Sequence, residues 1–257
     1  MSSTPVAVVT GSNKGIGFAI VRALCKQFQG DVFLTARDPG KGQAAVAKLQ
    51  EEGLHPFFHQ LDIDDLQSIR ALRDFLKEKY GGVNVLVNNA GIAFKGKKLI
   101  FWGVICFSFL LPGRVVNVSS SISISSLARC SKELQQKFRS DTITEEELVK
   151  LMTKFVEDAK KNTHEKEGWP NTAYGVSKIG VTVLSRIQAR MINEKRKGDH
   201  ILLNACCPGW VRTDMAGPKA LKSPDEGAET PVYLALLPAD ANGPHGQFVS
   251  DKTVQTW

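Results

Sequence analysis

Apolar and polar positions follow two alternating rhythms along the first half of the chain. Strands are predicted where short, mostly apolar runs occur, at residues 6–10, 31–37, 57–61 and 83–88. Helices are predicted where apolar residues recur every three or four positions, at residues 15–28, 41–52 and 66–80. Strands and helices that alternate in this way form right-handed βαβ units on a parallel sheet.

The same alternation returns in the second half. Strands are predicted at 114–119 and 201–207, residues 247–250 can form a last strand, and a long helix runs through Tyr174 to Met191. No internal repeat or low-complexity linker divides the chain. We therefore predict a single domain over residues 1–257, with a doubly wound (Rossmann-type) parallel α/β sheet of about seven strands and helices on both faces.

A long helical insertion is predicted between residues 120 and 174. Thr144 and Glu147 form a capping box, and Ile143 can pack onto Leu148 as a hydrophobic staple. An apolar stripe follows at helical spacing: Leu148, Leu151, Met152, Phe155 and Val156. Such an insertion can pack on the surface as an ordinary helix, wall a substrate pocket or cover a dimer face.

The composition is that of an ordinary globular protein. Of the 257 residues, 42% are apolar and 23% charged, which excludes an intrinsically disordered chain. Lys and Arg number 33 against 26 Asp and Glu, so the formal net charge is +7. Because the basic residues are scattered rather than gathered into one block, we expect no nucleic-acid partner and attribute the charge to an anionic cofactor.

The five cysteines give no sign of a disulfide framework or a metal site. Their number is odd and their spacing fits no zinc pattern (Cys25, Cys106, Cys130, Cys206 and Cys207). The first residues lack the basic region and long apolar core of a signal peptide. We therefore expect reduced thiols, no bound metal and a cytoplasmic protein.

A glycine-rich loop joins the first predicted strand to the first predicted helix. It reads Thr10-Gly11-Ser12-Asn13-Lys14-Gly15-Ile16-Gly17. Glycines allow a tight turn and a close approach of a pyrophosphate to the helix N-terminus, where unpaired N–H groups and the helix dipole favour negative charge. Because the loop follows a strand and begins a βαβ series, we interpret it as a dinucleotide-binding loop rather than a simple turn.

The residues after the second strand bear on the choice of dinucleotide. Arg37 ends that strand, twenty residues after Gly17. In dinucleotide-binding folds an acidic residue at this position binds a free ribose 2′-hydroxyl, whereas an Arg accommodates a 2′-phosphate. Arg37 and Lys14 thus favour NADP. Asp38 would favour NAD if the register were shifted by one residue, but two cations against one carboxylate favour the phosphate.

A Tyr, a Lys and a Ser form the candidate catalytic group. Tyr174 and Lys178 are four residues apart on the long predicted helix and share one face. A phenol has a pKa of about 10, which a neighbouring ammonium lowers, so that the Tyr becomes a usable general acid. Ser119 and Ser120 follow a predicted strand at the edge where ligands of open α/β sheets bind, and a hydroxyl there can donate to a carbonyl oxygen. The alternative is that they are ordinary serines of a serine-rich loop.

Together these motifs resemble those of the short-chain dehydrogenase/reductase family. They are TGSNKGIG at 10–17, LDI at 61–63, NNAG at 88–91, NVSS at 117–120, YGVSK at 174–178 and PGWVRTD at 208–214. The long stretch SKELQQKFRSDTITEEELVKLMTKFVED before the Tyr helix is similar to that of the monomeric, cytosolic, NADPH-dependent carbonyl reductases. The resemblance implies a monomer that reduces quinones, aromatic ketones and aldehydes, and some prostaglandins and steroids, to alcohols.

The resemblance also implies a role for each matching residue. Ser120, Tyr174 and Lys178 would form the catalytic centre, with the second Ser of NVSS as the functional one. Ser120 and Trp210 would line the substrate site, although Trp210 can also be read as a core aromatic after a turn. NADP would be bound by Gly11, Asn13, Lys14, Gly15, Ile16, Gly17, Arg37, Asp62, Ile63, Asn89, Tyr174, Lys178, Val211 and Thr213.

One segment, residues 96–112, departs from the family pattern. Family members place a longer helix here, and it carries an Asn that joins the proton relay. The segment instead contains an apolar run at 99–111 without Asn. That run is shorter than the about 20 apolar residues of a transmembrane helix. A buried crossover helix that replaces the family's helix is a second alternative, but the run has no amphipathic face and its residues are poor helix formers.

The abrupt ends of this segment favour a substitution through alternative splicing or a wrong gene model. Two functions then stay open: an active carbonyl reductase, and a catalytically impaired variant that at most binds the dinucleotide. Association of residues 99–111 with a membrane surface is a weaker third alternative, and stable membrane insertion is not expected.

Replacing residues 96–112 by a segment of the family type is expected to raise both activity and stability. The apolar run supplies neither the relay Asn nor a helix that covers the sheet, and it can leave an exposed apolar patch. Menadione reduction with NADPH, soluble yield and melting temperature of the two chains measure the effect. Equal values would show that the segment is a tolerated variant.

Overall fold

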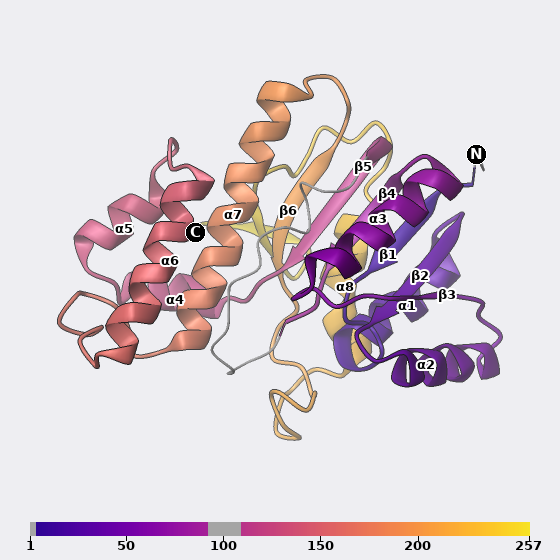
Figure 1. The fold of residues 1–257 in the computed structure, drawn as a ribbon, viewed down its shortest axis with the longest axis horizontal. Helices are drawn as coiled ribbons and strands as arrows, with labels where there is room; N and C mark the ends of the chain where they lie inside the picture. The colour runs from indigo at the N-terminus through magenta and orange to yellow at the C-terminus, as the bar shows by residue number, and fades with distance from the viewer. Residues whose placement is uncertain (1–3, 92–108) are drawn as a thin grey trace.

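Eight strands form one sheet in the computed structural model, which describes residues 4–91 and 109–257 (Figure 1). The strands are β1 (Val6–Val9), β2 (Asp31–Ala36), β3 (Phe57–Gln60), β4 (Val83–Asn88), β5 (Phe109–Val118), β6 (Leu202–Cys207), β7 (Phe248–Ser250) and β8 (Thr253–Gln255). Their order across the sheet is β3-β2-β1-β4-β5-β6-β7-β8. All neighbours pair in parallel except β7 and β8, which form an antiparallel hairpin. The predicted doubly wound parallel sheet is confirmed, with one antiparallel strand added at its edge.

Eight helices accompany the sheet within the described ranges. They are α1 (Gly15–Gln27), α2 (Pro39–Glu51), α3 (Leu66–Tyr80), α4 (Ile122–Ala128), α5 (Lys132–Arg139), α6 (Glu145–Lys160), α7 (Ala173–Lys195) and α8 (Pro224–Ala235). Local signals set several of their ends. Asp65 starts α3 by accepting a hydrogen bond from the Gln67 N–H at 2.9 Å, and Gly81 ends it with a φ of 84°. These two caps explain why α3 begins and ends at the predicted residues.

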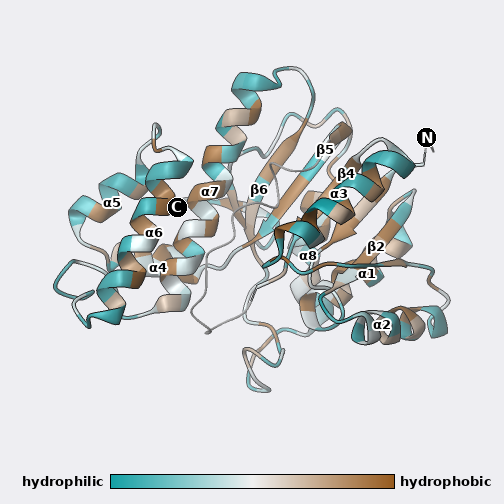
Figure 2. Ribbon diagram, viewed as in Figure 1, coloured by the Kyte–Doolittle hydropathy of each residue, from teal (hydrophilic) through white to brown (hydrophobic). Residues whose placement is uncertain are grey.

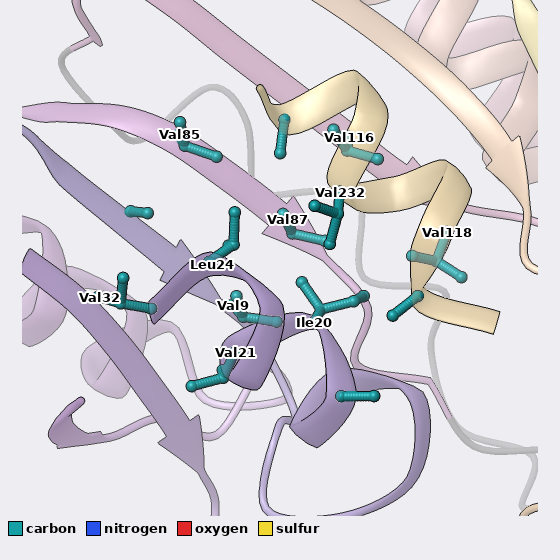
Figure 3. Close-up of a cluster of buried hydrophobic side chains, with 14 of the residues drawn as sticks. Val9, Ile20, Val21, Leu24, Val32, Val85, Val87, Val116, Val118 and Val232 are labelled. Atoms are coloured by element: carbon teal, nitrogen blue, oxygen red, sulfur yellow. The ribbon is translucent and has the colours of Figure 1, made fainter. Parts of the chain in front are cut away.

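Alternating side chains of the strands give the sheet two apolar faces. In β1, Ala7 and Val9 point to one face and Val6 and Val8 to the other, and all four are fully buried. Helices α1, α2 and α8 cover the first face, and α3 and α7 cover the second. Figure 3 shows side chains of α1 and α8 gathered over those of β1, β2, β4 and β5. In Figure 2 the strands are mostly brown, the hydrophobic colour, while teal residues gather on the helices.

The order of the strands reverses between β1 and β4. From β1 the sheet grows outward through β2 and β3 on one side and through β4 to β7 on the other. Open α/β sheets bind ligands beyond the carboxyl ends of the strands at such a reversal. The glycine-rich loop follows β1, so the fold places it at this reversal.

The structure adds elements that the sequence pattern did not predict. Strand β5 begins at Phe109 rather than at 114, so the end of the apolar run 99–111 lies in the sheet, where Phe109 pairs with Val83. The rest of that run, and with it residues 92–108, lies outside the described residues. Helices α4, α5 and α8 and strand β8 were also not predicted.

The insertion between β5 and α7 is confirmed as helical and packs against α7. The capping box of Thr144 and Glu147 starts α6 as predicted, and Ile143 and Leu148 are both buried. Buried side chains from α4, α5, α6 and the outer side of α7 form one cluster, separate from the two faces of the sheet. Val156 is an exception to the predicted stripe, because its side chain is 39% exposed and the stripe turns away from α7 there.

Leu148→Ala is expected to lower the free energy of unfolding by about 2–5 kcal/mol, because the Leu148 side chain is fully buried in the cluster between α6 and α7. The matched control is Val156→Ala on the same helix. Its exposed side chain leaves no cavity, and we expect a change within about 0.5 kcal/mol. Urea denaturation measures both variants. Equal losses would contradict the assignment of the buried stripe.

Candidate active site

The loops that carry the predicted site residues leave the sheet at one edge. Parallel strands bring their carboxyl ends together, and the residues that follow β1 to β6 include every predicted cofactor and substrate residue outside α7. Helix α7 packs on the sheet face that α3 also covers, and it supplies Tyr174 and Lys178. The fold thus brings together residues that are up to 200 positions apart.

The glycine-rich loop is packed against the loop that follows β4. A Cβ atom on Gly11, whose φ is 60°, would lie 2.8 Å from the Ala90 Cα, and one on Gly17 would lie 2.5 Å from the Asn89 Nδ2. The Asn89 side-chain amide donates to the carbonyls of Thr10 and Gly11, both at 3.0 Å. This packing therefore requires glycine at positions 11 and 17. Asn89, which is predicted to contact the cofactor, also holds the glycine-rich loop in place.

The N-terminus of α1 is suited to an anion. Asp, Ser or Thr side chains cap α2, α3 and α5 to α8, whereas Lys14 at the N-cap of α1 makes no such hydrogen bond. The first turn of α1 contains no acidic residue. Its free N–H groups and the helix dipole can therefore bind a pyrophosphate, and the residues present fit a dinucleotide.

The two residues after β2 lie in different surroundings. The Asp38 carboxylate caps α2 and accepts a hydrogen bond from the Lys41 N–H at 3.0 Å. Arg37 is exposed at the carboxyl end of the strand. Because Asp38 caps a helix, Arg37 rather than Asp38 is the side chain available for the predicted contact with an adenosine ribose. After β3, the Asp62 side chain accepts from the Asp64 N–H at 3.0 Å, and Ile63 is half-buried beside it.

Lys14 forms an ion pair with Asp214, which links the glycine-rich loop to the loop after β6. The Lys14 ammonium, through its hydrogen bond, lowers the pKa of the Asp214 carboxyl. Next to Asp214, Thr213 lies over the same loop, with its Cγ2 atom 3.3 Å from the position of a Cβ on Gly15. A 2′-phosphate would compete with Asp214 for the Lys14 ammonium.

Four contacts place the predicted catalytic residues at the carboxyl end of β5. Thr172 caps α7 by accepting from the Gly175 N–H at 3.1 Å, so Tyr174 lies in the first turn and Lys178 one turn further on. The Lys178 Nζ lies 5.7 Å from the centroid of the Tyr174 ring and donates to the Val118 carbonyl at 2.9 Å. The Ser120 hydroxyl lies near the Tyr174 phenol and opposes the rise in its pKa that burial causes, and it accepts a hydrogen bond from the Ile122 N–H at 3.2 Å. The predicted group of three is therefore assembled.

The two serines of NVSS have different positions. Ser119 is buried and its hydroxyl points to α7, where the Lys178 carbonyl lies at 3.1 Å and the Thr182 hydroxyl at 2.8 Å. Ser120 is only half-buried and faces Tyr174. The geometry therefore favours Ser120 over Ser119 as the serine that meets a substrate, in agreement with the sequence prediction.

The pKa values differ from the expectation in one respect. Burial raises the pKa of Tyr174, and the smaller effect of the hydrogen bond with Ser120 does not offset it. Burial also lowers the pKa of Lys178 to about 8. The expected lowering of the Tyr174 pKa by Lys178 is thus not seen, because removal from water penalises both charged forms. A neutral phenol is nevertheless the form that can give up a proton.

Trp210 and Val211 follow β6 and lie in different surroundings. The Trp210 side chain is 54% exposed, so it is not the core aromatic of the alternative interpretation. Val211 is buried and packs on α8, where a Cβ on Gly227 would lie 2.5 Å from its Cγ2 atom. Met215 and Leu221 in the same loop are also exposed, which gives this side of the site an apolar surface.

Comparisons with known proteins agree with this geometry. A sequence model of short chain dehydrogenases matches residues 5–100. A protein named carbonyl reductase (NADPH) 1 from Pongo abelii is 69% identical over 276 aligned positions, which cover 100% of this chain and 99% of the relative. The protein of the same name from Homo sapiens is also 69% identical, with the same coverage.

The chain belongs to the short-chain dehydrogenase/reductase family. Among solved structures, salutaridine reductase from Papaver somniferum superimposes with a TM-score of 0.80 at 31% identity, covering 96% of this chain and 99% of that one. Menthone neomenthol reductase from Mentha piperita has a TM-score of 0.77 at 28% identity, with coverage of 97% and 99%. The alignments with the two carbonyl reductases span 276 positions, whereas this chain has 257 residues. The chain therefore lacks residues that these relatives have, as a shortened internal segment would produce.

Several side chains that hold the site together were not predicted. Asn88 donates to Asn117 at 2.8 Å, and Asn117 donates to the Ser185 hydroxyl on α7 at 2.9 Å. Thr182 bonds to Ser119, as described above. Thr182 and Ser185 lie one and two turns beyond Lys178 on the same side of α7. The sequence signal for these contacts is the spacing of Thr182 and Ser185, two polar residues on the buried side of a helix.

Arg37→Asp is expected to weaken NADPH binding at least tenfold while changing NADH binding much less. The substitution removes the cation that faces the adenosine ribose and puts a carboxylate where a 2′-phosphate would lie. Fluorescence titration with each dinucleotide measures the two affinities. Asp38→Asn, which retains a capping side chain, serves as the control and should change neither. Equal loss for both dinucleotides with Arg37→Asp would mean that Arg37 does not meet the phosphate.

Proposed function

We propose that this chain is an NADPH-dependent carbonyl reductase that converts small carbonyl compounds to alcohols. Quinones, aromatic ketones and aldehydes are the substrates proposed first, with prostaglandins and steroids as further members of the class. The observation that carries the proposal is the position of Ser120 and Tyr174, two hydroxyl donors within reach of each other, beside a loop suited to a dinucleotide. Two converging donors suit a carbonyl oxygen that gains negative charge.

The relatives support the same reaction. Eight full-length relatives, 65% to 69% identical to this chain, are named carbonyl reductase (NADPH) 1. The two proteins with similar solved structures are also named as reductases, salutaridine reductase and menthone neomenthol reductase. NADPH is accordingly the proposed cofactor, in agreement with the positions of Lys14 and Arg37.

Each catalytic side chain has one proposed task. NADPH supplies the hydride that reduces the carbonyl carbon. Tyr174, which burial keeps protonated, donates its phenolic proton to the carbonyl oxygen as that oxygen becomes an alcohol. Ser120 donates a hydrogen bond to the same oxygen. The Lys178 ammonium, one turn away, stabilises the phenolate that Tyr174 becomes.

The cofactor contacts are proposed residue by residue. Gly11, Gly15 and Gly17, with the N–H groups of Asn13 to Gly17, would bind the pyrophosphate, and Lys14 and Arg37 the 2′-phosphate. Asp62 and Ile63 would flank the adenine, and Asn89 and Lys178 the riboses. Val211 and Thr213 would meet the carboxamide end, and Trp210 would line the substrate side.

We further propose a monomer formed by a single domain over residues 1–257 that works in the cytoplasm. The helical insertion packs along the outer side of α7 and buries apolar side chains that would otherwise be free to bind a second copy. Among the described helices, none is long and apolar enough to cross a membrane. The scattered charge leaves nucleic acid without support as a partner.

The alternative of a catalytically impaired variant finds no support in the described residues or in the relatives. The shortened segment 96–112 that raised this alternative lies largely outside the described residues. The prediction made for that segment therefore stays a prediction.

Tyr174→Phe is expected to lower kcat for menadione reduction by at least about a hundredfold, because the proposed mechanism takes its proton from the Tyr174 phenol, whereas Ser120 only donates a hydrogen bond. NADPH binding should remain nearly unchanged, since the phenyl ring is retained. Stopped-flow or steady-state oxidation of NADPH measures the rate, and fluorescence titration measures the binding.

Tyr233→Phe is the matched control, since Tyr233 lies on α8 with its side chain 38% exposed and away from the catalytic group. It should keep the rate of the unmodified chain. If Tyr174→Phe also kept most of that rate, another acid would have to serve in its place.

A further inference from the structure

A line of hydroxyl groups connects Trp257 with the catalytic loop. The indole N–H of Trp257 donates to the Ser123 hydroxyl on α4 at 2.8 Å. The Ser123 Oγ lies 3.5 Å from the Thr182 Oγ1 on α7, which is the longest step, and the Thr182 Oγ1 lies 2.8 Å from the Ser119 Oγ. Ser119 is the residue directly before Ser120. One line of polar contacts thus joins the C-terminal tail, α4, α7 and the end of β5.

The three hydroxyls in this line are buried away from water. Ser119, Ser123 and Thr182 are 2%, 0% and 1% exposed. A buried hydroxyl without a partner costs free energy. The Ser119 and Thr182 hydroxyls also lie 3.1 and 3.0 Å from the Lys178 carbonyl, so the line is attached to α7 at that carbonyl as well. The indole N–H is a donor only, and Ser123 must therefore accept from it. This requirement fixes the direction of the hydrogen bond at one end of the line.

Trp257 itself is held on two sides. Its ring packs against the apolar cluster of α4 to α7 and against the cluster of Ala205, Cys207 and Phe248. The Arg186 guanidinium lies 5.8 Å from the centroid of the indole, and Arg186 is itself paired with Asp141 at 2.9 Å. In Figure 1 the chain ends beside α4, α6 and α7, two residues after the end of β8. These contacts hold the indole in place, and its N–H in turn holds Ser123 of α4.

The position of Ser120 depends on the two elements that this line joins. Ser119 is tied to the sheet, because its N–H donates to the Cys206 carbonyl at 2.7 Å. The Ser120 carbonyl accepts from the Ser123 N–H at 2.9 Å, which is the first hydrogen bond leading into α4. Ser120 thus lies on the link between β5 and α4, and any shift of α4 would move its hydroxyl relative to Tyr174.

We propose that Trp257 is a positioning residue for carbonyl reduction, which acts through Ser123 and Thr182 to hold the Ser120 hydroxyl beside Tyr174. The inference rests on the proposed function, since it assigns a role in that same reaction. Trp257 touches neither the substrate nor the cofactor site. Its indole N–H holds Ser123 on α4. The Thr182 hydroxyl contacts both Ser123 and Ser119, and Ser119 directly precedes Ser120.

The test uses variants that remove one hydrogen-bonding group while keeping the packing. Trp257→Phe keeps an aromatic ring and removes the N–H, and Thr182→Val keeps the shape and removes the hydroxyl. Each is expected to lower kcat for menadione by roughly threefold to tenfold, because a small displacement of a catalytic group slows the chemical step. The KM for NADPH should stay unchanged. Thr182→Ser restores the hydroxyl and should recover most of the rate.

Trp169→Phe is the matched control. The Trp169 indole is also buried and donates to the Asp158 carboxylate at 3.0 Å, but it lies in the insertion rather than in this line. It should lower the melting temperature and leave kcat unchanged. All rates are measured well below the lowest melting temperature of the set.

A lower melting temperature with unchanged kcat in both Trp257→Phe and Thr182→Val would overturn the inference and leave only a structural role. Failure of the unmodified chain to oxidise NADPH with menadione would instead overturn the proposed function. The double variant gives a further check. Its kcat should be no lower than that of Thr182→Val alone, because both changes interrupt the same line, whereas multiplied losses would show two independent effects.

Discussion

The hydrogen bond from the Lys178 ammonium to the Val118 carbonyl joins helix α7 to the last residues of strand β5. Two further contacts run alongside it, from Ser119 to the Lys178 carbonyl and from Asn117 to Ser185. All three lie where the strand ends and the catalytic loop begins. Because they hold the helix at a fixed height along the strand, Tyr174 on the first turn of α7 meets Ser120 on the loop. Without this register the catalytic side chains would be present but separated.

Burial at this attachment disfavours the charged forms of Tyr174 and Lys178, and this effect suits the proposed reaction. An ammonium and a phenol that are both drawn out of water are shifted toward their neutral forms, which is why the pKa of Lys178 falls and that of Tyr174 rises. A phenol that stays protonated is a ready acid for a carbonyl oxygen. A phenolate formed during the reaction would find the ammonium one helical turn away. The site thus favours proton donation without needing an ionised Tyr beforehand.

Helix α7 also explains why the insertion and the C-terminal tail matter to a site that neither of them enters. One side of α7 packs on the sheet through residues such as Ala189, and the other side is covered by α4, α5 and α6. The indole of Trp257 packs into the second cluster and bonds to α4. The helix that carries the acid is therefore held from both sides.

Much of the fold could be predicted because its signals are local. Asp65 and Gly81 mark the ends of α3, and the glycine-rich loop marks the start of α1. Helix α8 was missed although Ser223 and Glu226 form a capping box, because Pro231 interrupts its pattern. Helix α4 was missed because its serine-rich sequence has weak helix propensity and is held by tertiary contacts.

The site divides in the same way. Ser120, Tyr174 and Lys178 stand in motifs and could be named from the sequence. The contacts that support them, such as that of Thr182 with Ser119, join residues 63 positions apart and follow from packing alone. The raised pKa of Tyr174 was not predicted either, because burial is a property of the folded chain.

The central claim is that this arrangement directs a hydride and a proton onto one carbonyl group. The most direct measurement uses an aromatic ketone and NADPH deuterated at the transferable position of the nicotinamide, with the alcohol analysed by mass spectrometry and NMR. The account predicts an alcohol that carries one deuterium on the former carbonyl carbon, while the same reaction with unlabelled NADPH in D₂O leaves that carbon free of deuterium. Absence of alcohol, or an alcohol whose carbon takes its hydrogen from the solvent, would contradict it.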